Sequence, residues 1–149
     1  MLTRRLFLAI PTSLLPLAAC ASTPIRRLIV YKASSCTCCE GWISAMRRAG
    51  FAPQIHAQDD VSVIWRRYGV PDALSSCHIG LVGGYVVVGH VPPADVTRLL
   101  VERPLAVGLT VPGMPIGSPG MEIPGAASEP FRTLLLFRNG TTRVFARHG

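Results

Sequence analysis

The feature that most constrains the fold is an apolar strand, a cysteine-containing loop and an amphipathic helix that follow one another early in the chain. Residues 27–31 form a short apolar run, which is typical of a buried strand. From Cys38 to Ala49 the apolar residues fall on one face of a helix, and Gly50 follows as the expected C-cap. A serine of the loop, residues 33–35, is available to cap the helix. The segment therefore predicts an α/β fold that begins with a strand, a loop and a helix.

The rest of the chain continues this alternation. In order, we expect a strand at 53–56, a helix from Asp59-Asp60 to Gly69, a hairpin at 79–88, a helix from Pro92-Pro93 to Pro104, and a second hairpin at 133–146. Residues 105–130 are rich in Gly and Pro, and no regular structure is expected there. The order resembles the thioredoxin fold, a mixed sheet flanked by helices, with an added Gly/Pro/Met loop and C-terminal β-hairpin. Either hairpin could occupy the core of the sheet.

The first twenty residues look like an export signal. Residues 3–8, Thr-Arg-Arg-Leu-Phe-Leu, resemble the twin-arginine signal, and the apolar run that follows is too short and proline-broken to span a membrane. Residues 17–20, Leu-Ala-Ala-Cys, resemble a lipobox in which Cys20 is lipidated; ordinary cleavage after Ala21 is the alternative. We expect an export signal at 1–20, a short linker at 21–26, and one domain at 27–149 in the bacterial periplasm, anchored to the membrane by lipid.

Composition narrows the class of protein. Of the 149 residues, 49% are hydrophobic and 15% are charged, which excludes a disordered chain. The formal net charge is +7, and its arginine pairs lack interleaved aromatic residues. We therefore expect no nucleic-acid partner. The charge is better suited to solubility or to contact with anionic lipid.

Four cysteines of the expected domain carry the chemistry. Cys36 and Cys39 have the C-x-x-C spacing of a redox pair, and Cys38 is an additional thiol between them. The start of a helix stabilises thiolates, which are both nucleophiles and metal ligands. Cys77, just before the strand expected at 79–82, is placed to join them if the fold is thioredoxin-like. Thiolates suit copper(I) and zinc, but a zinc site normally uses two separated C-x-x-C pairs and this chain has one.

Four further side chains are secondary candidates for metal ligands. They are His78, beside Cys77, then Met114 and Met121 of the Gly/Pro loop, and His90. Each has an ordinary structural interpretation: a histidine near a strand end is more often a satisfied surface residue, and a loop methionine more often fills a core gap. For the cysteines themselves, the alternative is structural disulfides in an oxidising compartment.

Several motifs together resemble one known family. They are Val30-Tyr31-Lys32, Cys36-x-Cys38-Cys39, Trp42, 49–51, 69–71, Ser76-Cys77-His78, 83–85, 89–92 and 112–121. This combination, over about residues 27–146, resembles the CopG-type family of predicted metal-binding proteins of the bacterial envelope, which is associated with copper resistance. The resemblance implies a thioredoxin-like fold and a copper site, which can be multinuclear and thiolate-bridged, formed by Cys36, Cys38, Cys39 and Cys77, with His78 beside them. Where the family motif has glycine, this chain has Thr37, and the bulkier threonine restricts the conformation of the loop.

Two functions follow from these residues. The first is a periplasmic copper(I)-binding protein that holds copper through clustered thiolates in copper resistance or homeostasis, with copper redox activity as an extension. Its partners would be copper ions, other periplasmic copper proteins and the membrane. The second is a thiol–disulfide oxidoreductase, in which Cys36 is the nucleophile and Cys39 resolves the mixed disulfide. Cys38 and Cys77 favour the metal, because a redox enzyme needs only two thiols. Whether the chain is an enzyme is left open.

Overall fold

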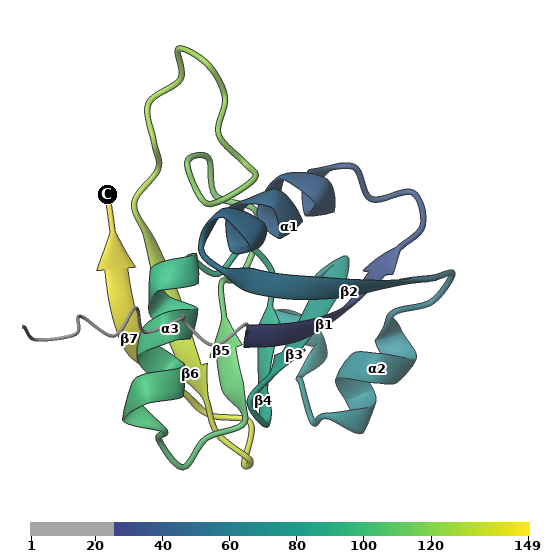
Figure 1. The fold of residues 1–149 in the computed structure, drawn as a ribbon. Helices are drawn as coiled ribbons and strands as arrows, with labels where there is room; N and C mark the ends of the chain where they lie inside the picture. Colours follow the sequence, from purple (N-terminus) through teal and green to yellow (C-terminus); the bar gives the residue numbers. More distant parts are fainter. Residues whose placement is uncertain (1–25) are drawn as a thin grey trace, which may run out of the picture.

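The computed structural model describes residues 26–149, so the expected export signal, Cys20 and residues 21–25 lie outside the described part. The described residues form a mixed α/β fold with one seven-stranded sheet and three α-helices (Figure 1). None of these helices is long and apolar enough to cross a membrane. The elements are β1 (Arg26–Ala33), α1 (Cys38–Arg48), β2 (Phe51–Gln58), α2 (Ser62–Arg67), a 3-10 turn (Asp72–Leu74), β3 (His78–Val82), β4 (Tyr85–Val88), α3 (Pro93–Glu102), β5 (Gly108–Thr110), β6 (Phe131–Leu136) and β7 (Thr142–His148).

The strand order places the first hairpin at the centre of the sheet. The order is β2-β1-β3-β4-β5-β6-β7. β1 and β2 pair in parallel through the crossover helix α1, and β3 pairs antiparallel with both β1 and β4. β4 then pairs in parallel with β5, and β5 pairs antiparallel with β6. The second hairpin, β6 and β7, therefore extends the sheet at its far edge instead of occupying the core.

One strand corrects the sequence analysis. The prediction of no regular structure in residues 105–130 is wrong at β5, which lies between β4 and β6. Its three residues are all buried, and a Cβ on Gly108 would lie 1.8 Å from the carbonyl oxygen of Val86 on β4. Only glycine allows this approach of the two strands. A three-residue strand between Gly- and Pro-rich segments is too short to show an apolar period.

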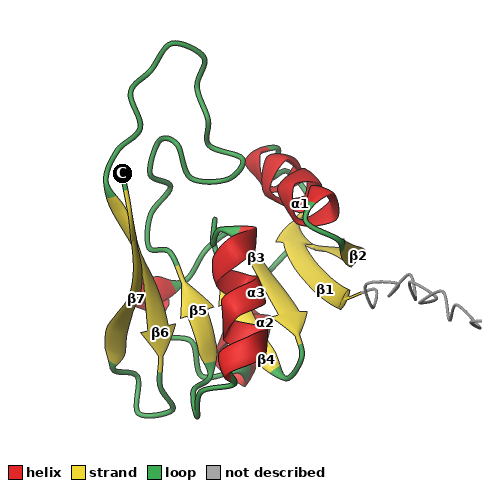
Figure 2. Cartoon of the chain, turned by 60° about the vertical axis from the view of Figure 1, so that its left-hand side comes forward, coloured by secondary structure: helices red, strands yellow, loops and turns green. Residues whose placement is uncertain are grey.

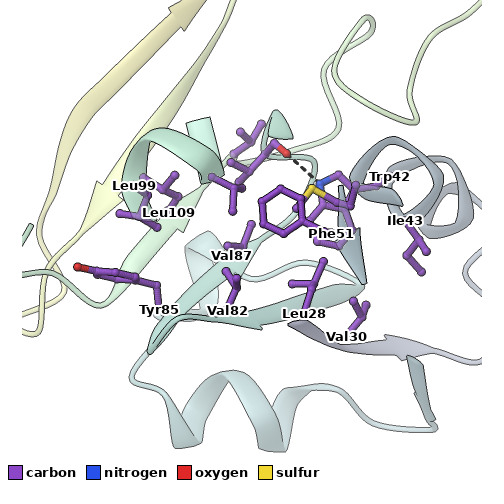
Figure 3. Close-up of a cluster of buried hydrophobic side chains, with 14 of the residues drawn as sticks. Leu28, Val30, Trp42, Ile43, Phe51, Val82, Tyr85, Val87, Leu99 and Leu109 are labelled. Atoms are coloured by element: carbon purple, nitrogen blue, oxygen red, sulfur yellow. Dashed lines mark hydrogen bonds between the residues drawn. The ribbon is translucent and has the colours of Figure 1, made fainter. Parts of the chain in front are cut away.

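The helices cover the two faces of the sheet unequally. Views from two sides place α1 and α3 over one face and α2 over the other (Figures 1 and 2). The larger buried cluster lies under α1 and α3 and contains Trp42, Ile43 and Met46 of α1 (Figure 3). The smaller cluster packs Ile64 and Trp65 of α2 against strands β3 and β4. The helix expected after Asp59-Asp60 begins only at Ser62, whose backbone N–H donates to the Asp60 carboxylate at 2.7 Å.

Candidate metal centre

Four cysteines meet at the C-terminal end of β1, and we call them the cysteine cluster. Cys36 lies in the loop after β1, and Cys77 immediately precedes β3. Cys38 and Cys39 are the first two residues of α1. All four sulfur atoms lie within 4.8 Å of one another. The fold therefore joins the cysteine-rich loop to a thiol that is 38 positions or more away in sequence.

Backbone contacts hold the two segments of the cluster together. The Ala33 N–H donates to the Cys77 carbonyl at 2.9 Å, and the Cys36 N–H donates to the Ala33 carbonyl at 3.0 Å. The N-cap of α1 is Thr37, and no side chain caps the helix, so the predicted serine cap is wrong. The helix start lacks a side-chain acceptor, and its dipole favours negative charge on the neighbouring sulfur atoms.

The cluster combines one disulfide with two thiols. A disulfide joins Cys36 and Cys39, whose Cα atoms are 5.7 Å apart, whereas Cys38 and Cys77 are free thiols. The Cys77 sulfur lies 3.0 Å from the Cys36 sulfur and 3.4 Å from the Cys39 sulfur. The Cys38 sulfur is 3.3 Å from that of Cys36. Both free thiols therefore contact the disulfide, as thiol–disulfide exchange requires.

Burial affects the ionisation of Cys77, one of the two free thiols. It raises the pKa of Cys77, and the neighbouring Cys38 raises it further when that group is charged. Cys77 is therefore a poorer spontaneous thiolate than an exposed cysteine. Removal of its proton needs a compensating positive charge nearby, and a bound cation would supply one.

His78 lies directly beside the cluster and is fully buried. Its Nε2 is 3.0 Å from the Gly89 carbonyl, so Nε2 carries the proton and donates it there. Nδ1 keeps its lone pair and lies 3.9 Å from the Cys77 sulfur. Burial, with a smaller effect of the nearby His90, lowers the pKa of His78 to about 3. The neutral ring can thus act as a nitrogen ligand or as a hydrogen-bond acceptor for the Cys77 thiol.

His90 is not the surface residue that its strand-end position suggests. It is fully buried, and its ring meets the His78 ring edge-on with centroids 5.1 Å apart. Nδ1 donates to the Pro119 carbonyl at 2.9 Å, whereas the buried Nε2 has no hydrogen-bond partner among the described residues. Burial lowers its pKa. The Trp42 ring packs against His78, with centroids 4.6 Å apart, and its indole N–H donates to the Val91 carbonyl at 2.9 Å.

The two methionine candidates lie in the loop that covers α1. Met114 is 55% exposed. Met121 is partly buried and follows Gly120, which packs tightly on the first turns of α1. A Cβ on Gly120 would lie 2.4 Å from the backbone nitrogen of Trp42 and 3.1 Å from the Cys38 carbonyl oxygen. The structure therefore brings the loop backbone against the first turns of α1, beside the cysteine cluster, and a role of the two thioethers as metal ligands stays a prediction.

Lys32 is a site residue that the sequence analysis missed. It is only 7% exposed and lies opposite His78 in the pairing of β1 with β3. Its ammonium group is 3.3 Å from the Glu40 carboxylate in the first turn of α1. A signal was present, because Lys32 is the one lysine among fifteen basic residues and ends an apolar strand. The pKa of His78, the ring beside the cysteine cluster, is lowered chiefly by burial and further by the positive charge of Lys32. That cluster becomes negative when its thiols ionise.

Comparison with known proteins relates this geometry to a family. Residues 74–121, which contain Cys77, His78 and His90, match a family described as a protein of unknown function, DUF411. No curated protein sequence matches the chain.

Two solved structures resemble nearly the whole described domain. One is described as copper resistance protein CopG, form 2, with a TM-score of 0.78 and 39% sequence identity; the match covers 84% of this chain and 99% of that one. The other, form 1 of copper resistance protein CopG, has a TM-score of 0.77 and 40% identity over 85% of this chain and 98% of that one. With this identity and coverage, the chain belongs to the family of the copper resistance protein CopG.

Proposed function

We propose that the chain is a periplasmic copper(I)-binding protein that holds copper through the thiolates of Cys36, Cys38, Cys39 and Cys77, in copper resistance or homeostasis. The observation that carries the proposal is the convergence of four sulfur atoms within 4.8 Å. The CopG relatives, which are named for copper resistance, support copper as the metal.

The chemistry of the donor set fits copper(I). Sulfur is a soft ligand that selects copper(I), zinc or iron–sulfur clusters. Around a single tetrahedral ion with bonds of about 2.3 Å, sulfur atoms would be about 3.8 Å apart. Three contacts in the cluster are 3.0, 3.3 and 3.4 Å, and a disulfide makes the fourth. These are the contacts of the disulfide form, so copper binding requires reduction and a small separation of the sulfur atoms. The reduced thiolates can then be shared between several copper ions, with His78 Nδ1 as an adjacent nitrogen donor.

The redox state of the cluster sets how many ligands it offers. Reduction of the Cys36–Cys39 disulfide takes two electrons and two protons and yields two further thiols. Copper(I) binding then displaces the thiol protons. In the reverse direction, two copper(II) ions would each accept one electron while the two thiolates form the disulfide. This balanced exchange is the copper redox activity that we include in the proposal.

Fold and sequence support the remaining parts of the proposal. The order β2-β1-β3-β4, with a parallel β1–β2 pair and helices on both faces, supports a thioredoxin-like core to which β5, β6 and β7 are added. The twin-arginine motif and the lipobox support export to the periplasm and a lipid anchor at Cys20. Other periplasmic copper proteins would then be the donors or acceptors of the ion.

A second candidate function rests on the disulfide itself. Cys36 and Cys39 form a disulfide in which Cys36 is half-buried and Cys39 is buried, which supports a thiol–disulfide oxidoreductase with Cys36 as nucleophile and Cys39 as the resolving thiol. This function uses the Cys36–Cys39 pair and does not need Cys38. Cys38 therefore separates the two candidates.

The test measures copper(I) bound by the full chain after reduction and anaerobic loading, in competition with a copper(I) chelator. Wild type, Cys38→Ser and the control Ser34→Ala, which keeps all four thiols, are compared in parallel. We expect chelator-resistant copper in wild type and in the control, and a loss of at least about tenfold in affinity in Cys38→Ser. If copper binds weakly in all three while disulfide exchange persists in Cys38→Ser, the oxidoreductase is the correct function.

A further inference from the structure

The surface far from the cysteine cluster is basic, and we call it the basic end. In Figure 1 the C-terminus of α2, the β3–β4 turn, the α3–β5 connection and the β6–β7 turn lie together at the bottom, whereas α1 and the loop before it lie at the top. The basic end consists of the arginines and apolar residues of these segments and of the start of β1: Arg27, Arg66, Arg67, Arg103, Arg138, Val101 and Leu105.

Two adjoining hollows open on this end. The first, of about 320 Å³, is lined by Arg27 and by the β3–β4 turn. The second, of about 400 Å³, is lined by Arg66, Arg67 and Arg138. Tyr68 and Gly84 line both hollows, so the two lie side by side. The planar guanidinium group binds phosphate oxygens in pairs, and arginines around a hollow are suited to phosphate groups.

The arginines of this end form no ion pair within the described part of the chain. The pKa of the Asp60 carboxyl is lowered mainly by hydrogen bonds from Ser62, and the charge of Arg66 helps to lower it. Glu102, the acid nearest in sequence to Arg103, is 3.1 Å from Arg98 instead. Arg66 donates only to the Ser62 hydroxyl, at 2.6 Å. These guanidinium groups are therefore available to an external anion.

Exposed aliphatic side chains accompany the arginines. Leu105 is 94% exposed and Val101 is 73% exposed, and both flank the end of α3. Between them, Arg103 adopts a left-handed backbone conformation with φ of 47°. Aliphatic side chains among cations are the pattern of surfaces that lie on a membrane, where apolar groups enter the headgroup layer and cations contact phosphates. A nucleic-acid surface would use the cations with aromatic residues that stack on bases. Here the aromatic residue that lines both hollows, Tyr68, is 38% exposed, whereas the two aliphatic side chains are much more exposed.

The start of the domain lies on the same side. Residues 1–25 precede Arg26, which donates to the Thr97 hydroxyl of α3 at 2.8 Å, and the next residue, Arg27, lines the first hollow. A membrane attachment made by the preceding residues would therefore reach the domain beside the basic end. This position, together with the charge, selects a membrane over other anionic partners.

We propose that the basic end docks on a membrane surface rich in anionic phospholipid. Its arginines contact lipid phosphates, Leu105 and Val101 lie among the headgroups, and the cysteine cluster faces away from the membrane. The proposal does not depend on copper, because none of these residues belongs to the cysteine cluster.

The test is flotation of the full chain with vesicles of phosphatidylcholine alone and of phosphatidylcholine mixed with phosphatidylglycerol. The variant Arg67→Gln/Arg138→Gln is compared with Arg132→Gln/Arg147→Gln, which removes the same charge from exposed cross-strand neighbours on β6 and β7. All proteins carry the same residues 1–25, so differences between variants report on the folded domain. Leu105→Asn tests the apolar contact separately.

We expect the Arg67/Arg138 pair to weaken binding to the anionic vesicles by about 25-fold, about fivefold for each arginine, with a smaller loss in the control pair. Leu105→Asn should weaken binding severalfold, and copper binding should stay at the wild-type level in every variant. Equal losses in the two arginine pairs, or equal binding to both kinds of vesicle, would overturn the proposal. So would a loss in the Arg67/Arg138 pair that is seen with duplex DNA and not with vesicles.

Discussion

Lys32 places a buried positive charge opposite His78, which lies beside the cysteine cluster. Four thiolates carry more negative charge than the one or two copper(I) ions nearest them, and an ammonium group in a region of low dielectric constant offsets part of that excess. Glu40, its partner, is 55% exposed at the side chain and is therefore well solvated. Lys32 thus stabilises the ionised cluster more than Glu40 destabilises it.

Replacing Lys32 with methionine should weaken copper(I) binding by about tenfold, the cost typical of groups that support metal ligands from outside the ligand set. Methionine keeps the side-chain length, so the fold should persist. Chelator competition on the reduced protein measures the effect. Glu40→Gln is the matched control, since it removes the acid and keeps the cation, and it should leave affinity unchanged or slightly higher. Equal weakening in both variants would show that the ion pair acts through structure alone.

His78 makes stability dependent on pH. Its pKa is lowered from 6.5 to about 3 in the folded state, chiefly by burial. The unfolded chain therefore binds a proton at higher pH than the folded chain, and the free energy of unfolding should fall as pH drops from about 6.5 toward 3. The expected slope from this group is about 1.4 kcal/mol per pH unit.

Denaturant titrations of the metal-free protein across this pH range measure the slope. His78→Gln keeps a hydrogen-bond donor near Gly89 without a titrating ring, so its stability should vary less with pH. His56→Gln, on the exposed face of β2, is the control and should keep the wild-type slope. A slope that is identical in His78→Gln and wild type would mean that other groups cause the acid sensitivity.

The loop between β5 and β6 is an element of the site even though it contains no regular structure. Gly120 has a positive φ of 87° and lies against the backbone of α1 beside Cys38. The Pro119 carbonyl of the same loop accepts a hydrogen bond from His90 Nδ1. It therefore covers both the start of α1 and the histidine pair.

Gly120→Ala should push the loop away from α1, because the Cβ of the alanine would overlap the backbone nitrogen of Trp42. Gly113→Ala is the matched control: it has a similar φ of 74° with no atom within 4 Å of the added Cβ. Both changes incur the cost of a left-handed alanine, about 1–2 kcal/mol, and only Gly120→Ala adds a steric clash. Thermal unfolding should show a larger loss for Gly120→Ala, together with weaker copper binding. Equal losses would mean that the loop packs loosely.

Prediction from sequence succeeded at the elements with a clear period and failed at those without one. Helix α1 and the two hairpins were predicted because apolar spacing and the Gly-Gly and Asn-Gly turns define them. β5 was missed because its three residues show no period, and its place in the sheet depends on pairing with distant strands. A mixed α/β fold is thus confirmed, while the number and order of strands needed the structure.

The candidate site, like the fold, could be predicted from the sequence only in part. Three cysteines are neighbours in sequence, so their proximity was predictable, and the expected place of Cys77 before β3 is where the structure puts it. The burial of His90 and of Lys32 was not predictable, because it depends on the sheet and on the covering loop. That all four cysteines bind copper stays a prediction.

Copper should stabilise the whole domain, because the cysteine cluster joins the β1–α1 loop to the start of β3. A ligand that binds only the folded state adds about 2.7 kcal/mol at a free concentration of 100 times its Kd. We expect copper(I) to raise the Tm of the reduced chain and Cys77→Ser to lose most of that rise, since the remaining thiols lie in one segment and stay available to copper after unfolding. Calorimetry with and without copper measures the shift, with Ser34→Ala as the control. If Cys77→Ser kept the full rise in Tm, Cys77 would not be a ligand and the site would be confined to the loop and the first turn of α1.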